Sequence, residues 1–277
     1  MIRINLHIHS TCSDGAFGPL ELVRLLRRHK VAVASLTDHD TVEGVVPFLA
    51  GCRRQGIRGV AGVELSSDSP EGELHILGYR FDLSSPELSA LMERSRVARR
   101  ERNLAICELL NGLGIPIVME EIEAVAGGRV VGRPHIAQVL RERGHVASVR
   151  EAFVRYLGRG AAAYVPRFLP SVEECIRIVR AAGGLPVWAH PLVSLPDPDR
   201  FEPVLDRLKG MGLWGVECWF QGADTAQVWR CLTQSGRRGL YATGGSDFHG
   251  RPGHPARIAG CLVEDDLLPW ARFCGGL

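Results

Sequence analysis

Nine side chains of the types that bind metal ions are spread along the whole sequence. They are six histidines and three carboxylates: His7, His9, Asp14, His39, Glu64, His75, His190, Asp247 and His249. Nearly all come at or just after the end of an expected strand, so a barrel of strands would bring them to one rim. Burying so many titratable groups together without a cation would leave polar atoms unpaired, at a total cost of roughly several kcal/mol. The pattern therefore predicts a metal centre.

The donor types indicate which ions would bind and what they would do. Imidazoles and carboxylates without a cysteine suit Mn²⁺, Zn²⁺ or Fe²⁺. Nine donors are too many for one ion, whereas three ions with about three donors each leave positions for water and substrate. Three divalent ions (+6) and the carboxylates Asp14, Glu64 and Asp247 (−3) leave a net +3, which attracts an anion such as phosphate. A hydroxide held between two such ions is nucleophilic near neutral pH, so phosphoester hydrolysis is the expected chemistry.

Strands and helices alternate in the two parts of the chain that carry these donors. Strands are expected over residues 2–9, 31–36, 57–63, 73–79, 185–189, 213–217 and 239–243. His7 and His9 fall on the same side of the first strand, because side chains alternate along a strand with a period of two. Helices are expected to begin at Pro19, Ser171 and Asp224. About seven strands followed by helices predict a closed or nearly closed β/α barrel, with its active site at the C-terminal ends of the strands.

Residues 84–168 interrupt this alternation, because they read as helices without a convincing strand. The stretch includes an arginine-rich run from Arg94 to Arg102 and a segment that opens at Pro134. An inserted all-helical subdomain that covers the active site is expected here. The chain would then divide into a barrel of residues 1–83 and 169–277 and an insertion of residues 84–168.

Composition narrows the function classes. The 277 residues are 45% hydrophobic and 23% charged, which is enough to bury a sizeable core without a disulfide or metal support. The formal net charge of 33 − 31 = +2 is too balanced for a protein that coats nucleic acid by bulk charge. No apolar run approaches the roughly 20 residues of a membrane-spanning helix, and the first residues lack the features of a signal peptide. The eight cysteines form no CxxC pair, so reduced thiols and a soluble, cytoplasmic protein are expected.

The motifs around the nine donors are specific when taken together. They are His7-x-His9 with Asp14, Thr37-Asp38-His39, Gly62-Val63-Glu64, His75, Ala189-His190-Pro191 and Gly245-Ser246-Asp247-Phe248-His249. This combination resembles the PHP (polymerase and histidinol phosphatase) domain family over almost the whole chain. The resemblance implies a distorted (β/α)7 barrel of PHP type and three divalent ions, with Mn²⁺ favoured over Zn²⁺ or Fe²⁺.

The same resemblance distributes the donors among three ions. One ion would be held by His7, His9, Glu64 and Asp247, a second by Glu64, His75 and His190, and the third by Asp14, His39 and His249. The catalytic group would be a metal-bound hydroxide supported by Asp14, His39 and His249.

Two further motifs resemble one subgroup of the family. Gly132-Arg133-Pro134-His135-Ile136-Ala137 and Tyr164-Val165-Pro166 resemble enzymes that remove the 3′-phosphate of nucleoside 3′,5′-bisphosphates and, in some members, trim RNA from its 5′ end. The implied partner is a nucleotide or a short RNA, with no membrane and no obligate protein partner. The alternatives are a small-molecule phosphatase of the histidinol-phosphate kind, a non-catalytic PHP module, and a barrel that binds ligands without metal.

Four residues of the helical stretch are candidates for binding a second phosphate. Bidentate guanidinium groups suit a phosphate, and the resemblance supports this role for Arg99, Arg102, Arg133 and His135. The alternative for the arginine run is a solvated helix face, and Arg167 is a weaker candidate for the same group.

Three carboxylates close to the donors are not expected to bind an ion directly. Asp38 and Asp40 flank His39, and either orient ligand imidazoles or cap the following helix. Glu217 ends an expected strand near the rim and is expected to lie behind the ligands.

Overall fold

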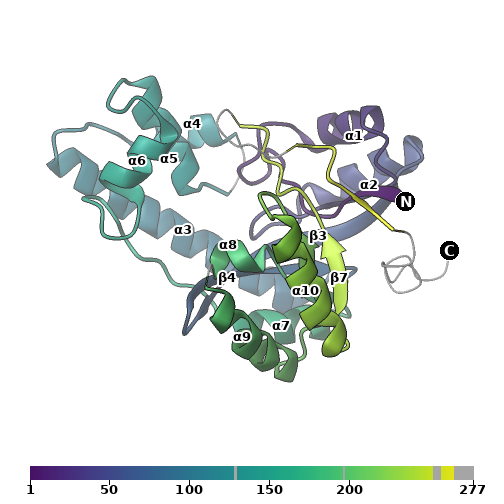
Figure 1. The fold of residues 1–277 in the computed structure, drawn as a ribbon. Coiled ribbons are helices and arrows are strands. Elements are labelled where there is room, and N and C mark those ends of the chain that lie inside the picture. Colours follow the sequence, from purple (N-terminus) through teal and green to yellow (C-terminus); the bar gives the residue numbers. More distant parts are fainter. Residues whose placement is uncertain (128–129, 196, 252–256, 265–277) are drawn as a thin grey trace.

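Eight strands form one sheet, in the order β7-β6-β5-β4-β3-β2-β1-β8 (Figure 1). The computed structural model describes residues 1–127, 130–195, 197–251 and 257–264. The strands are β1 (Ile2–Asn5), β2 (Val33–Leu36), β3 (Arg58–Ser69), β4 (Gly72–Tyr79), β5 (Leu185–Trp188), β6 (Gly215–Trp219), β7 (Tyr241–Gly244) and β8 (Cys261–Val263). All seven expected strands are present, and β8 is an eighth that the sequence reasoning missed.

The sheet curls until its two ends nearly meet. The end of β7 and the residues after it run beside the segment that follows β1: Leu6 N donates to Gly244 O (3.1 Å), and Asp247 N donates to His7 O (2.9 Å). This arrangement confirms the nearly closed α/β barrel, and it brings the first and last motifs of the sequence into contact.

The direction of the strands departs from an all-parallel barrel. β1, β2 and β3 run parallel to one another, as do β5, β6 and β7. β4 runs antiparallel to both of its neighbours, and β8 runs antiparallel to β1. Only Pro70 and Glu71 separate β3 from β4, and so short a connection can only form a hairpin.

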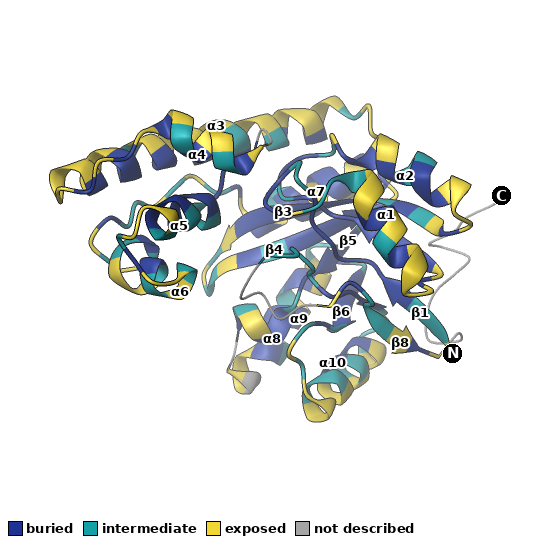
Figure 2. Cartoon of the chain, turned by 90° about the horizontal axis from the view of Figure 1, so that it is seen from above, coloured by how far each residue is buried: buried dark blue, intermediate teal, exposed yellow. Residues whose placement is uncertain are grey.

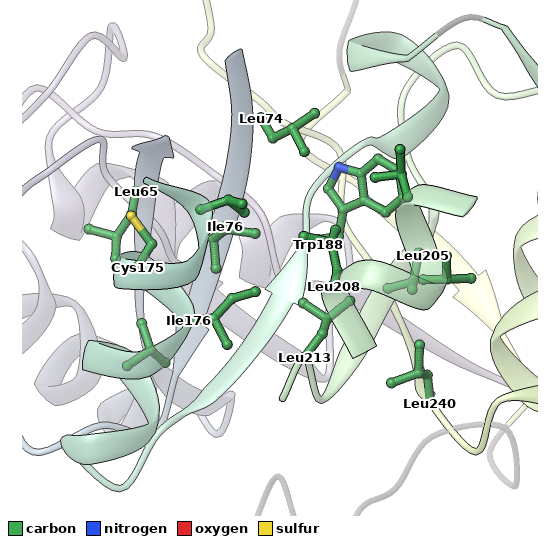
Figure 3. Close-up of a cluster of buried hydrophobic side chains, with 14 of the residues drawn as sticks. Leu65, Leu74, Ile76, Cys175, Ile176, Trp188, Leu205, Leu208, Leu213 and Leu240 are labelled. Carbon is green, nitrogen blue, oxygen red and sulfur yellow. The ribbon is translucent and has the colours of Figure 1, made fainter. Parts of the chain in front are cut away.

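Helices cover the outside of the barrel and bury one apolar face each. They are α1 (Pro19–Arg28), α2 (Val45–Arg54), α7 (Val172–Ala181), α8 (Pro191–Ser194), α9 (Pro198–Gly210) and α10 (Thr225–Arg237). Ser171 and Asp224 cap α7 and α10 by accepting hydrogen bonds from Glu174 N and Gln227 N. Figure 3 shows part of the core, with Ile76 of β4 and Trp188 of β5 lying between helices α7 and α9.

A second group of helices lies to one side of the barrel (Figures 1 and 2). It contains α3 (Pro86–Gly112), α4 (Met119–Ala126), α5 (Arg133–Glu142) and α6 (Val149–Ala152), followed by a π-helical turn at Phe153–Leu157. As expected, no strand occurs in the described part of residues 84–168. None of the described helices combines the length and the apolar character needed to cross a lipid bilayer.

Helix α3 joins two separate hydrophobic cores. Leu88 and Leu91 of its first turns pack in the barrel core, whereas Ile106 and Leu110 pack with α4 and α5 in a core of their own. We propose on this basis that residues 84–168 form a helical subdomain inserted into a barrel of residues 1–83 and 169–277. The first turns of α3 then belong to the barrel by packing, and the middle of the helix lies at the junction.

Candidate metal centre

The structure brings all nine expected donors together at one rim of the barrel. His7 and His9 follow β1, His39 follows β2, and His190 follows β5. Asp247 and His249 follow β7, and Asp14 lies in the loop after β1. Glu64 and His75 instead lie within the long strands β3 and β4, because these strands extend past the rim.

Three groups of donor atoms are close enough to share an ion. In each group the donor atoms lie within 4.8 Å of one another: His7, His9, Glu64 and Asp247; His39, Glu64 and His75; and His9, Asp14, His39 and His249. The first group contains the same four residues as the resemblance implies. In the second group His39 takes the place expected for His190, whose Nε2 lies 3.1 Å from Glu64 Oε1. The third group contains the three expected residues together with His9.

Glu64 is the central anion of this arrangement. Its Oε2 lies 3.0 Å from His39 Nδ1, 3.2 Å from His9 Nε2 and 3.3 Å from His7 Nε2. Its Oε1 lies 2.8 Å from His75 Nδ1. With His190, five imidazoles face this carboxylate, so Glu64 could contribute to more than one cation.

Unpaired buried atoms show that these residues fit a metal. His7 Nε2, both ring nitrogens of His9, His39 Nδ1 and Glu64 Oε2 are buried and make no hydrogen bond of acceptable geometry. Such atoms are costly in a folded protein unless another partner is present. Lone pairs of imidazoles and a carboxylate that converge without a sulfur donor suit a divalent cation such as Mn²⁺, Zn²⁺ or Fe²⁺.

The protonation equilibria follow the same charge pattern. Burial alone would lower the pKa of His9, but the adjacent carboxylates of Asp247 and Glu64 raise it to about 10. Burial likewise opposes protonation of His75, but Glu64 and Glu73 raise its pKa to about 10. Burial acts in the opposite direction on Asp247, yet His7 and His249 hold its pKa well below the usual range. Protons on these imidazoles thus supply the positive charge beside the carboxylates that a bound cation would supply. Metal binding would displace these protons.

Glu217 holds two of the donors from behind, as expected. It is fully buried, and its Oε1 lies 3.1 Å from His7 Nδ1. Its Oε2 accepts a hydrogen bond of 2.7 Å from the backbone N–H of His190. A carboxylate on Nδ1 fixes the imidazole tautomer and leaves His7 Nε2 directed at the metal centre.

Asp38 and Asp40 do neither of the two things expected of them. Asp38 accepts hydrogen bonds from Ser10 N (2.7 Å) and from the hydroxyl groups of Ser10 (2.6 Å) and Ser13 (2.5 Å), so it fixes the loop that presents Asp14. Asp40 pairs with Arg99, whose Nε and Nη2 lie 2.8 and 2.6 Å from Asp40 Oδ2. Both carboxylates tie the rim to segments that are distant in the sequence.

Strained backbone is concentrated at the centre. Five described non-glycine residues have a positive φ, and three of them are Asp40 (50°), His190 (28°) and Asp247 (52°). Such conformations are rare outside glycine, and they persist where the surroundings over-determine the chain.

An arginine-lined cavity of about 270 Å³ lies beside the His75 end of the metal centre. Four arginines and two carboxylates line it: Arg102, Arg133, Arg159 and Arg167, with Asp68 and Glu73. Glu73 Oε1 connects the two sites, because it lies 3.2 Å from Arg167 Nη2 and 3.5 Å from His75 Nε2.

The positive charge in this cavity is incompletely neutralised. Arg102 is only 5% exposed, and its Nε and Nη2 donate to the neutral side chain of Asn103. Within the described residues, no carboxylate forms an ion pair with Arg102 or Arg133. Burial and the charges of Arg99, Arg167 and Arg133 hold the pKa of Arg102 well below its usual range. The Nη1 of Arg167 is buried without a hydrogen bond. A buried cation without a partner is expensive, so the cavity suits an anion.

The four candidates for binding a second phosphate therefore occupy different positions. Arg102 and Arg133 line the cavity, whereas Arg99 lies against Asp40 and donates to Ser66 Oγ at 3.1 Å. His135 is fully buried in the first turn of α5, and its Nδ1 accepts a hydrogen bond from Gly132 N. Its Nε2 is buried without a hydrogen bond, and burial together with the charge of Arg251 lowers its pKa to about 4. His135 is thus neutral at pH 7, with Nε2–H free to donate.

Comparisons with known proteins agree with this site. A family model described as the PHP domain matches residues 5–113. A 5′-3′ exoribonuclease of Haemophilus influenzae is 32% identical over 98% of this chain and 99% of its own length. The chain belongs to the PHP family. A 3′,5′-nucleoside bisphosphate phosphatase of Chromobacterium violaceum is 31% identical over 98% of this chain and 95% of its own length.

The fold of a solved PHP-type structure is also shared. A protein of Bifidobacterium adolescentis, provisionally described as a metal-dependent phosphoesterase, superimposes with a TM-score of 0.86 and 31% identity. The match covers 95% of this chain and 93% of that structure. With the donor clusters, these likenesses identify the chain as a metal-dependent phosphoester hydrolase of the PHP family.

Sequence reasoning missed several residues that shape this PHP site. Ser10 and Ser13 follow the His7-x-His9 motif, and their hydroxyl groups donate hydrogen bonds to Asp38. Small hydroxyl residues beside the expected ligand Asp14 were a signal that could have been used. Arg159 follows a glycine within the insertion, and nothing in the local sequence connects it to the cavity. Its position depends on how the insertion folds back over the barrel.

Proposed function

We propose that this chain hydrolyses the 3′-phosphate ester of nucleoside 3′,5′-bisphosphates and removes nucleotides from the 5′ end of short RNA. One observation carries the choice of substrate. An arginine cavity without enough carboxylates to neutralise it lies beside the donor cluster. A substrate with one phosphate at the metal centre and a second in the cavity would satisfy both sites. Two relatives that match over nearly their whole length, a 5′-3′ exoribonuclease and a 3′,5′-nucleoside bisphosphate phosphatase, support the same substrate class.

The nine donors would hold three divalent ions, because imidazoles and carboxylates without a sulfur ligand suit Mn²⁺, Zn²⁺ or Fe²⁺, and the resemblance to the PHP family favours Mn²⁺ among them. When bound, such ions polarise phosphoryl oxygens and lower the pKa of coordinated water. Around them, Glu217 keeps His7 Nε2 directed inward, and Asp38 keeps the loop that carries Asp14 in place. Asp14, His39 and His249 form the group that would support the attacking oxygen.

The arginines would position the other phosphate of the substrate. Arg102, Arg133 and Arg167 would contact the 5′-phosphate directly, since they line the cavity. Arg99 would add positive charge from its place against Asp40. His135 would donate from Nε2, which is buried and unpaired. We also propose that the protein acts in the cytoplasm, because all seven described cysteines are free thiols.

The test compares substrates with one and two phosphates. Purified protein with Mn²⁺ is assayed with adenosine 3′,5′-bisphosphate, adenosine 3′-monophosphate, a 5′-phosphorylated RNA oligomer and histidinol phosphate. We expect kcat/KM for the bisphosphate to exceed that for the 3′-monophosphate on the order of 10- to 100-fold, the worth of about 1.5–3 kcal/mol of charged hydrogen bonding. In Arg133→Ala this difference should shrink, mainly through KM.

Two results would overturn this assignment. Equal kcat/KM for the bisphosphate and the 3′-monophosphate in wild-type protein would remove the role of the arginine cavity. A preference for histidinol phosphate would favour a small-molecule phosphatase with a pocket for a single phosphate. Arg27→Ala on the exposed face of α1 is the matched control for loss of one positive charge far from the site.

A further inference from the structure

A second and larger cavity opens on the other end of the metal centre. Its volume is about 650 Å³, within the usual range of roughly 300–1,000 Å³ for small-molecule sites. Asp14 and His249, two of the metal donors, form part of its wall. The arginine cavity instead adjoins the His75 end through Glu73. The two cavities therefore flank the donor cluster.

One side chain contacts the walls of both cavities. The central carbon of the Arg133 guanidinium lies 5.9 Å from the centroid of the Phe153 ring and 5.9 Å from that of the Tyr164 ring. Phe153 lines the large cavity and Tyr164 lines the arginine cavity. A chain-like substrate at the metal centre would thus meet the arginine cavity near His75 and the large cavity near Asp14 and His249.

The walls of the large cavity combine apolar surface with cations. Pro134, Ala147, Val149 and Phe153 supply apolar and aromatic groups. Arg141 and Arg150 also line it, and among the described residues neither forms an ion pair or a hydrogen bond with another side chain. An aromatic ring with apolar neighbours suits a nucleobase, and unpaired guanidinium groups suit backbone phosphates.

We propose that the large cavity binds the second nucleotide of a 5′-phosphorylated RNA, the one attached to the phosphorus under attack. This inference rests on the proposed function. The first nucleotide would place its 5′-phosphate in the arginine cavity, and the next backbone phosphate along the strand would reach Arg141 and Arg150. With this cavity the protein would bind RNA as well as mononucleotides.

The same bond is broken in both kinds of substrate. The oxygen of water bonds to phosphorus, the bond from phosphorus to O3′ of the first nucleotide breaks, and O3′ takes a proton. A bisphosphate yields a nucleoside 5′-monophosphate and inorganic phosphate. An RNA yields a nucleoside 5′-monophosphate and a shortened RNA that carries the phosphate on its 5′ end. The new end has the group that the arginine cavity requires, so the cycle can repeat without another enzyme.

The test uses variants that alter only the large cavity. Arg141→Ala/Arg150→Ala removes both unpaired cations, and Ala147→Trp fills the cavity without changing the charge. Each is assayed with Mn²⁺ on a 5′-phosphorylated triadenylate and on adenosine 3′,5′-bisphosphate. We expect kcat/KM for the triadenylate to fall on the order of 10- to 100-fold in both variants, while kcat/KM for the bisphosphate stays within about two-fold. Arg27→Ala is again the control for one lost surface charge.

The outcomes separate this inference from the function on which it rests. Equal losses on both substrates, or no loss on the triadenylate, would overturn the second-nucleotide site. Wild-type protein that hydrolyses the bisphosphate but not the triadenylate would overturn it together with the RNA part of the proposed function, and would leave the bisphosphate activity in place. Wild-type protein that hydrolyses neither would overturn the proposed function itself.

Discussion

The barrel rim and the helical insertion both bring charged side chains to the site, but they hold them in opposite ways. At the rim, opposite charges already face one another, since Glu64 Oε2 lies within 3.3 Å of three imidazole nitrogens. In the insertion, Arg102 and Arg133 have no carboxylate partner within the described residues. The rim is suited to bind cations between fixed carboxylates. The insertion instead has fixed cations, which suit an anion that binds and dissociates, such as a substrate phosphate.

The backbone that supports each region differs in the same sense. The rim donors lie at strand ends and in strained turns. Backbone hydrogen bonds connect these segments where the barrel closes, as between Asp247 N and His7 O. The arginines stand mainly on helices and loops with a hydrophobic core of their own. Chemistry and substrate choice thus depend on separately packed parts of the molecule, so one can change while the other keeps its geometry.

The largest effect should come from breaking the rim. In His9→Ala or Asp247→Ala, turnover of every phosphoester substrate should fall by several orders of magnitude, because activation of the attacking water is lost. Steady-state kinetics with Mn²⁺ measures the loss, and elemental analysis measures bound metal per chain.

These variants should keep their fold, which circular dichroism and the melting temperature will show. His29→Ala, an exposed histidine at the end of α1, is the matched control. Turnover equal to that of wild type in either rim variant would contradict the assignment of the metal centre.

The two regions also differ in how far the sequence predicted them. The nine donors could be found because the chemistry demands particular residue types at strand ends, and all nine converge. The contacts of Asp38 with Ser13 and of Asp40 with Arg99 could not, because they join residues 25 and 59 positions apart. Arg99 was expected to be free for phosphate, and only the packing of α3 against the rim reveals its carboxylate partner.

The fold shows a similar division. Alternating strands and helices predicted the barrel, but the antiparallel direction of β4 depends on the two-residue connection Pro70-Glu71, a signal that was present and not used. The three residues of β8 are too few to show a pattern, and they form a strand because β1 offers a free edge there.

An intermediate effect should separate anion binding in the arginine cavity from metal binding at the rim. Adenosine 5′-monophosphate, which carries only the phosphate destined for the arginine cavity, is titrated into metal-free protein by calorimetry. In Arg102→Gln its affinity should fall on the order of 10- to 100-fold, since a buried charged hydrogen-bond donor is lost. In His9→Ala it should stay within about three-fold of wild type, a difference of less than about 1 kcal/mol. Equal losses in both variants would mean that the rim and the cavity do not act separately.

The last effect, on stability rather than on turnover or affinity, concerns His135, the one uncharged member of the proposed phosphate-binding group. Its pKa of about 4 in the folded protein lies below the value of about 6.5 expected in the unfolded chain. As the pH falls below 6.5, the His135 imidazole becomes protonated in the unfolded chain but not in the folded protein. The free energy of unfolding therefore declines until about pH 4. At pH 5 this decline amounts to about 2 kcal/mol, and His135→Gln should not share it. Denaturant unfolding of both proteins at pH 7.5 and 5.0 isolates the difference, because the remaining histidines are common to both. If both lose the same stability on acidification, His135 is protonated as readily in the folded protein as in water, and the insertion would present it to phosphate as a cation like its arginines.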